Sequence, residues 1–298
     1  MIDRACISLN NNCNLKCKYC HFANKNIANP SELTSDNAEK IIKNIADYCR
    51  DNNLDKFKLG IVGSGEPFLS YNSLKAIVIE ADKYGNLFSL YTITNGISLT
   101  NEQLQFFYEH RSLIELNFSL DGNEEIHNNF RQGYEKTIET INRYKEIFGI
   151  APRINATITR KSLQNKEQLV NYFKSNGFDR VNFSCVSDVA DPKIAVNREE
   201  YEDFLNSCFQ HKIIMRQKND ENKDKYDCTM YGKNCGVGRT NIFITKQGIY
   251  PCGRFFGLDD YRLGDLHTSL RDIELSFSKL KHIEKGLCYF DVYVGKKK

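Results

Sequence analysis

Three cysteines near the start of the chain are spaced closely enough to share one metal centre. Cys13, Cys17 and Cys20 form the pattern C-x₃-C-x₂-C, and the aromatic Tyr19 precedes the last of them. Thiolates are soft ligands that suit iron–sulfur clusters or zinc. Three of them in one loop can hold three irons of a 4Fe–4S cube and leave the fourth iron open to the amino and carboxylate groups of a ligand. The alternative is a zinc loop that takes a fourth ligand such as His21.

A second group of cysteines lies in the last quarter of the chain. It consists of Cys228, Cys235, Cys252 and Cys288. Four thiolates suit either another iron–sulfur cluster or a zinc ion. The remaining cysteines have no metal-like spacing and are expected to be small buried apolar residues, although Cys185 could face an interior cavity. They are Cys6, Cys49, Cys185 and Cys208.

The composition limits the kind of protein that carries these cysteines. The chain has 298 residues, 41% hydrophobic and 27% charged, with a net charge of +3, which is too mild to indicate a nucleic-acid partner. No apolar run approaches the roughly 18 residues of a membrane span, and the amino terminus lacks a signal peptide. We therefore expect a soluble, cytoplasmic protein. In that reducing compartment, eleven cysteines indicate metal binding rather than disulfides.

Six short apolar, β-branched runs alternate with amphipathic helical patterns over the first 190 residues. This alternation predicts an α/β fold with a parallel sheet, arranged as a partial (β/α)6 TIM-like barrel. The active site of such a barrel lies at the carboxyl ends of the strands. The expected strands lie near residues 5–9, 57–62, 88–94, 114–120, 154–159 and 181–186.

The pattern changes after residue 190. Residues 191–226 are predicted to be a bridging helix and a charged linker, and residues 227–298 a small α+β domain. That domain contains a hairpin of 242–245 against 249–251 and a last helix over 269–284.

Polar and glycine residues stand where the predicted strands end. The second strand is followed by Gly65, Glu66 and Pro67, the third ends at Asn95, and the fourth is followed by Asp121 and later Arg131, after Ser119. Glycine lets a backbone approach a ligand closely, and a carboxylate suits an ammonium group. Taken singly, each segment is an ordinary strand-to-helix loop.

Together, and in this order, these segments resemble the radical S-adenosylmethionine (SAM) superfamily. The resemblance implies that Cys13, Cys17 and Cys20 are the catalytic cluster ligands, and that the 4Fe–4S cluster reductively cleaves SAM to a 5′-deoxyadenosyl radical. It also implies a set of SAM contacts, in which Glu66 and its neighbours bind the amino group, Ser119 the ribose and Arg131 the carboxylate. The full set is Tyr19, Gly65, Glu66, Pro67, Asn95, Ser119, Asp121 and Arg131. Ser64 stands where the family usually has glycine.

The carboxyl-terminal cysteines extend the resemblance. The segments from Cys235 to Cys252, with Leu263-Gly-Asp-Leu266 downstream, are similar to the SPASM or twitch extension of this superfamily. That likeness implies one auxiliary 4Fe–4S cluster held by Cys228, Cys235, Cys252 and Cys288. A full SPASM domain has a further C-x₂-C run that is missing here, so the shorter twitch (half-SPASM) type fits better.

The substrate is the least determined part of this interpretation. In sulfatase-maturating relatives an aspartate follows the Pro-Cys segment, whereas here Gly253 does, which argues against formylglycine formation. We expect oxidative modification of a side chain in a ribosomally made peptide or protein, with a flavodoxin- or ferredoxin-like reductant. Because the first strand starts close to Met1, a separate leader-binding protein is a further expected partner. The alternatives are a twitch-type dehydrogenase of a small alcohol or sugar-like substrate, and a non-catalytic zinc-binding protein.

Overall fold

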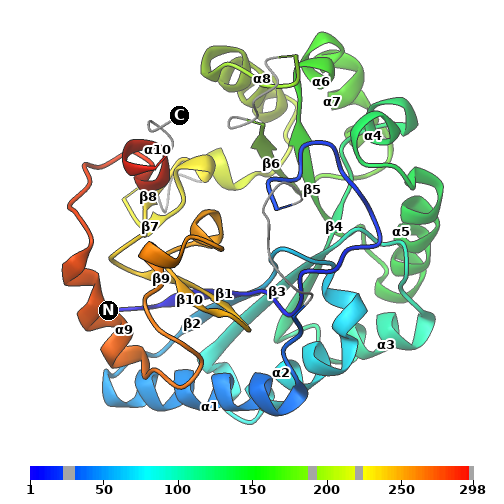
Figure 1. The fold of residues 1–298 in the computed structure, drawn as a ribbon. Coiled ribbons are helices and arrows are strands. Elements are labelled where there is room, and N and C mark those ends of the chain that lie inside the picture. The colour runs from blue at the N-terminus through cyan, green and yellow to red at the C-terminus, as the bar shows by residue number, and fades with distance from the viewer. Residues whose placement is uncertain (23–30, 187–192, 219–223, 295–298) are drawn as a thin grey trace.

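Eight strands form one sheet that curves into an open barrel, with helices along its outer face (Figure 1). The computed structural model describes residues 1–22, 31–186, 193–218 and 224–294. The strands are β1 (Arg4–Ile7), β2 (Phe57–Ile61), β3 (Phe88–Thr94), β4 (Ile114–Ser119), β5 (Arg153–Ile158), β6 (Val181–Cys185), β9 (Asn241–Thr245) and β10 (Gly248–Tyr250). Their order is β10-β9-β1-β2-β3-β4-β5-β6, and only the β9–β10 pair is antiparallel. Strands β1 to β6 confirm the predicted partial barrel.

The helices that follow the strands pack on the outside of this sheet (Figure 1). They are α1 (Ser35–Asp51), α2 (Tyr71–Asp82), α3 (Asn101–Glu109), α4 (Glu124–Phe130), α5 (Tyr134–Phe148), α6 (Arg160–Gln164), α7 (Lys166–Ser175), α8 (Arg198–Gln210) and α9 (Leu270–Ser276). One more short helix, α10 (Tyr289–Tyr293), lies in the carboxyl-terminal region. Within the described ranges, none of them is long and apolar enough to cross a membrane.

Side chains alternate between the two faces of the strands, as the period of two in a β-strand requires. In β5, Ile154, Ala156 and Ile158 are buried in the main apolar core, on the side of the helices. Arg153 and Asn155 instead line a cavity in the barrel interior. The barrel is therefore apolar outside, beneath its helices, and polar inside, which suits a reaction chamber rather than a packed core.

The carboxyl-terminal region joins the barrel instead of standing apart from it. The expected hairpin is formed by β9 and β10, and β9 pairs in parallel with β1, with Ala5 opposite Ile242. A short two-stranded sheet, β7 (Tyr226–Asp227) with β8 (Asn234–Cys235), lies nearby. A second, smaller apolar cluster around Phe255 and Tyr289 gives this region its own core. The division into units 1–190, 191–226 and 227–298 stays a prediction.

The last predicted helix is shorter than expected. In place of one helix over 269–284, α9 ends at Ser276 and a single 3₁₀ turn follows over Phe277–Lys279. Part of the predicted linker lies outside the described residues.

Candidate active site

The first cysteine loop is fastened to the carboxyl ends of three neighbouring strands. Asn12 at its start accepts a hydrogen bond from the backbone N–H of Glu66 after β2 (2.8 Å). The side chain of Asn95 after β3 donates to Asn14 (2.6 Å) and lies 3.9 Å from the sulfur of Cys13. The backbone N–H of Lys18 donates to a carbonyl at the end of α4 (2.8 Å). Cys13 is exposed, and Cys17 and Cys20 are half-buried, so all three thiols remain reachable by a cluster.

The Gly65-Glu66-Pro67 segment packs directly against this loop. A Cβ atom at Gly65 would lie 1.9 Å from the side-chain oxygen of Asn10, so only glycine fits there. Ser64, which departs from the family's usual glycine, donates from its backbone N–H to Ser8 (2.9 Å). Pro67 begins a 3₁₀ turn, where its missing N–H costs nothing.

Glu66 is nearly fully buried, and its carboxylate connects the ends of β2 and β3. It accepts hydrogen bonds from the hydroxyl of Thr94 (2.7 Å) and from the backbone N–H of Asn95 (2.9 Å). Burial raises the pKa of Glu66, although these donors oppose the rise. Both carboxylate oxygens thus already have partners, so a bound ammonium group would join an existing network.

Asp121 brings three of the predicted SAM contacts together. Its carboxylate accepts from Tyr19, from Arg131 (3.3 Å) and from the backbone N–H of Thr157 (2.9 Å). Burial alone would lower the pKa of Arg131, but Asp121, Tyr19 and Cys17 raise it above its ordinary value. The guanidinium is therefore a fixed positive charge beside the first cysteine group.

Ser119 and His127 complete this edge of the barrel. Ser119 is the last residue of β4 and is buried. In the described part of the chain its hydroxyl makes no hydrogen bond. His127 is fully buried and lies within hydrogen-bond distance of the backbone N–H of Asp121 (3.4 Å) and of the carbonyl of Gln132 (3.2 Å). It therefore supports the loop that carries Asp121 and Arg131.

The thiols of the first group affect one another's ionisation. Burial raises the pKa of Cys17 to about 11, and Asp121, Cys20 and Cys13 add to the rise while Arg131 opposes it. Burial also raises the pKa of Cys13. These shifts favour the protonated forms of Cys13 and Cys17, so metal binding to their thiolates must release protons.

A cavity of about 850 Å³ occupies the barrel interior below this edge. His21 and Phe22, directly after the first cysteine group, form part of its wall. The four carboxyl-terminal cysteines line the same cavity: Cys228, Cys235, Cys252 and Cys288. The structure therefore brings the four cysteines of the second predicted group to one cavity, whose wall also includes the two residues that follow Cys20.

The pKa values of two cysteines in the second group agree with the closeness of its thiols. Burial raises the pKa of Cys228 to about 12 and raises that of Cys252 as well, and in both cases neighbouring thiols of the group contribute. The guanidinium of Arg254 donates to the sulfur of Cys288 (3.2 Å) and to Asp291 (2.8 Å). Four soft donors beside a cation fit an iron–sulfur cluster, whose thiolates accept such hydrogen bonds. Among the described side chains, no three of His, Cys, Asp and Glu converge tightly enough for a single metal ion.

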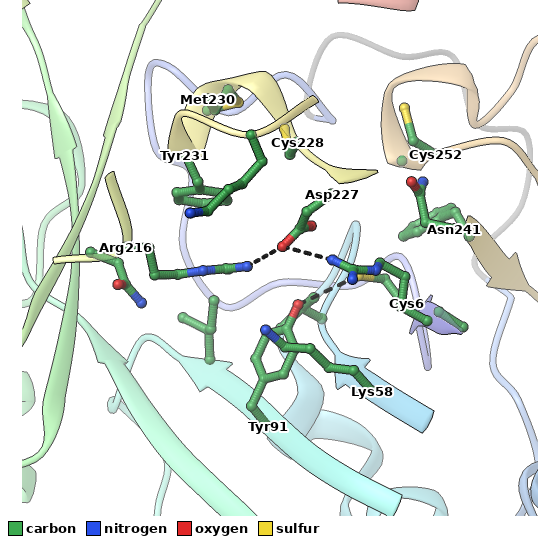
Figure 2. A pocket seen from close by; sticks show the side chains of 18 of the residues that line it. Cys6, Lys58, Tyr91, Arg216, Asp227, Cys228, Met230, Tyr231, Asn241 and Cys252 are labelled. Carbon is green, nitrogen blue, oxygen red and sulfur yellow. Dashed lines mark hydrogen bonds and ion pairs between the residues drawn. The ribbon is translucent and has the colours of Figure 1, made fainter. Parts of the chain in front are cut away.

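Sequence reasoning missed a group of charged and polar residues on the cavity wall. Figure 2 shows Arg216 facing Asp227, with Lys58, Tyr91 and Cys6 beside them. Cys6 packs against the second apolar cluster and also lines the cavity, where its sulfur is 3.6 Å from the hydroxyl of Tyr91. Polar residues at every second position of the strands were the signal that could have revealed this wall, because alternate residues of a strand face the same side. By contrast Cys49 and Cys208 are buried apolar residues as expected, and Cys185 packs against the main core.

An open barrel with a cysteine loop at the carboxyl ends of its strands defines a class of protein, and comparison with known families identifies it. Residues 7–159 match the model of the radical SAM superfamily, and the chain belongs to that superfamily. Its members use a 4Fe–4S cluster and SAM, which are accordingly the cofactors of this chain.

Two proteins from methanogenic archaea are similar to this chain in sequence. An uncharacterised protein of Methanocaldococcus jannaschii is 29% identical over 261 residues, which cover 85% of each chain. The AdoMet-dependent heme synthase of Methanosarcina barkeri is 26% identical over 271 residues, covering 81% of this chain and 74% of that protein.

Two solved structures share the fold over almost the whole chain. The structure of anSMEcpe with bound AdoMet and a Cp18Cys peptide has a TM-score of 0.76 at 18% identity, covering 93% of this chain and 82% of that one. Streptococcus suis SuiB bound to the precursor peptide SuiA has a TM-score of 0.68 at 18% identity, covering 92% of this chain and 64% of that one.

Proposed function

We propose that this radical SAM enzyme oxidatively modifies a side chain of a peptide or protein. The observation that carries the proposal is the cavity of about 850 Å³, because it is bordered by His21 and Phe22 next to the first cysteine group and by all four cysteines of the second. A substrate in that chamber would lie between two sets of thiol ligands. Such an arrangement suits a reaction that begins at one cluster and ends with electron transfer or substrate binding at the other.

In the proposed mechanism Cys13, Cys17 and Cys20 hold the first cluster as thiolates. When bound there and reduced, the cluster would supply the one electron that cleaves SAM to methionine and a 5′-deoxyadenosyl radical able to abstract a hydrogen atom from the substrate. The chain itself binds and orients SAM. Arg131, fixed by Asp121 at 3.3 Å, would pair with the carboxylate of SAM.

The remaining predicted contacts would complete the SAM site. Glu66 lies where it could accept from the SAM ammonium while keeping the ends of β2 and β3 together. Asn95 and Ser119 face the same edge of the barrel, and Tyr19 holds the carboxylate of Asp121. The wall of the barrel would keep water and stray hydrogen donors away from the radical.

The second cysteine group would hold the auxiliary 4Fe–4S cluster. Four cysteines on one cavity wall support this assignment, as do the pKa values of Cys228 and Cys252, which burial and neighbouring thiols raise, and the guanidinium that donates to Cys288. Zinc is the competing metal, since it also accepts four thiolates. The auxiliary cluster would accept an electron from the substrate or position it.

The peptide class is supported by fold alone. The anSMEcpe structure contains a bound Cp18Cys peptide, the SuiB structure is bound to the precursor peptide SuiA, and both share the fold of this chain. The proposal keeps a flavodoxin- or ferredoxin-like reductant and a separate leader-binding protein as partners. A small alcohol or sugar-like substrate is the alternative, and the heme synthase relative shows that close sequences act on other molecules.

The test compares metal content and coupling in three cysteine variants. Anaerobically reconstituted protein should contain about eight irons, and Cys17→Ala should lose about half of them together with all SAM cleavage. Cys252→Ala should keep SAM cleavage but lose coupling to product, measured by mass spectrometry of candidate precursor peptides. Cys185→Ala, a half-buried cysteine outside both groups, is the matched control and should behave as wild type. Stoichiometric zinc with negligible iron would refute the proposal.

A further inference from the structure

Three cations surround one carboxylate inside the barrel cavity. They are Arg4 on β1, Lys58 on β2 and Arg216 on the segment after α8, and we call them the cation cluster. Asp227 pairs with both arginines, at 2.9 Å from Arg4 and in close contact with Arg216 (Figure 2). Arg4 and Lys58 are opposite each other in the β1–β2 register, so both project to the same interior face.

Lys58 is the cation that this network does not neutralise. Its ammonium lies 5.5 Å from the centre of the Tyr91 ring, and among the described residues it makes no ion pair. Burial, followed by repulsion from Arg216 and Arg4, lowers the pKa of Lys58 to about 8 even though Asp227 opposes the change. A half-buried cation without a counter-ion is costly, and an anion from outside the chain would relieve that cost.

The other two arginines of the wall are already occupied. Arg153 pairs with Glu115 at 3.2 Å. Arg254 binds Asp291 and the sulfur of Cys288, so it belongs to the second cysteine group. Arg4 pairs with Asp3 as well as with Asp227. Of the other lysines on the wall, Lys225 is exposed and Lys233 has an interaction partner, so the half-buried charge without a counter-ion is that of Lys58.

Unsatisfied asparagines on the opposite wall are a second, independent observation. Asn117 on β4 and Asn182 on β6 have buried side-chain oxygens without a hydrogen-bond partner, and Asn155 on β5 has a buried amide nitrogen without one. All three residues line the same cavity. Two acceptors and one donor without partners suit a ligand that carries both donors and acceptors, such as the N–H and C=O groups of a peptide.

We propose that the cation cluster, through Lys58, binds the side-chain carboxylate of an Asp or Glu residue in the substrate, while the three asparagines bind the peptide groups beside it. This inference rests on the proposed function in taking the cavity as the peptide chamber. It deepens that function by naming the chemistry of the bound residue. A lysine ammonium facing a carboxylate in a low-dielectric chamber gives a charge-assisted hydrogen bond that selects acidic over amide side chains.

The test measures binding without turnover, by saturation-transfer NMR titration of the reconstituted holoenzyme. The probes are acetyl-Ala-Glu-Ala-amide, its Gln counterpart and inorganic phosphate. Wild type should bind the Glu peptide about ten- to hundredfold more tightly than the Gln peptide, as expected for one charged hydrogen bond. Lys58→Gln should abolish that preference, and Lys58→Arg should retain it. The exposed Lys56, two residues away, provides the control variant Lys56→Gln, which should match wild type.

Equal affinity of wild type for the two peptides, or binding of neither, would overturn the inference. Tighter binding of phosphate than of the Glu peptide would overturn the assignment to a carboxylate. If Lys58→Gln did not fold, judged by circular dichroism, the wild-type and Lys58→Arg comparisons would still decide. Because the assay requires no product, a Glu preference in an enzyme that modifies no peptide would refute the proposed function while supporting the anion site.

Discussion

Buried His127 should make stability fall as the pH drops from 7 toward 5. The imidazole is fully buried, and its Nδ1 accepts from the backbone N–H of Asp121, which leaves Nε2–H to donate to the carbonyl of Gln132. Burial, aided by Arg131 and opposed by Asp121, lowers the pKa of His127 to about 4. The neutral ring is thus built into the loop that carries two of the proposed SAM contacts.

The size of the effect follows from proton linkage. In the unfolded chain a histidine binds a proton near pH 6.5. Between that pH and about 4 the unfolded state binds more protons than the folded one, so acid favours unfolding. The stability from neutral His127 is complete above pH 6.5. It should be lower by about 2 kcal/mol at pH 5, and the loss should level off at about 3 kcal/mol below pH 4.

Urea unfolding at pH 5, 6 and 7, under anaerobic conditions, measures this loss. His127→Gln keeps a donor and an acceptor but cannot titrate, so its stability should fall about 2 kcal/mol less than that of wild type between pH 7 and 5. His211→Gln removes an exposed histidine and should follow wild type. Other titrating groups are common to all three proteins and cancel in the comparison. Parallel losses in wild type and His127→Gln would refute the reasoning.

Two further predictions concern the SAM site and the cavity wall. Arg131→Ala should weaken SAM binding about ten- to hundredfold by calorimetry, and unchanged affinity with lost product would show that Arg131 does not bind SAM. Gly60→Ala would place a Cβ atom 2.5 Å from the ring of Tyr91, so it should lower the melting temperature much more in wild type than in a Tyr91→Leu background. An equal cost in both backgrounds would mean that Gly60 is not needed to accommodate the ring.

The edge of the barrel could be predicted because parallel strands place their carboxyl ends together. Glu66 and Asn95 are far apart in the sequence, yet each follows a strand, and the structure joins them by a hydrogen bond of 2.9 Å. The same rule brings Asp121, after β4, to Tyr19 in the loop after β1. Strand order and direction were sufficient for these contacts, since the strands follow one another in both the chain and the sheet.

The local sequence pattern could not decide which residue is the N-cap of α1. Thr34 and Asp36 are both residue types that cap helices. The structure uses Thr34, whose hydroxyl accepts from the backbone N–H of Asn37 (3.2 Å), so that Asp36 lies in the first turn. Both Thr and Asp are good N-caps, and the choice depends on where the preceding chain leaves the barrel.

The cavity wall was harder to predict, because its residues come from distant segments. A lone lysine or arginine in a short strand, such as Lys58 or Arg4, normally faces solvent. Here the curvature of the sheet turns that face toward the interior of the barrel. Asp227 and Arg216 reach the cavity from beyond the barrel strands. The sequence of a short hairpin also carries no information about which sheet it joins, so the pairing of β9 with β1 was not foreseen.

Asp227 connects the cation cluster to the second cysteine group. It directly precedes Cys228, and its ion pairs with Arg4 and Arg216 fasten that cysteine to the barrel wall. A cluster bound by four thiolates would carry net negative charge, and Arg216 interacts electrostatically with Cys228. Arg216 would therefore be drawn toward the cluster when it is bound. Lys58, on β2 and outside this ion-pair network, would remain the cation that a substrate carboxylate can neutralise.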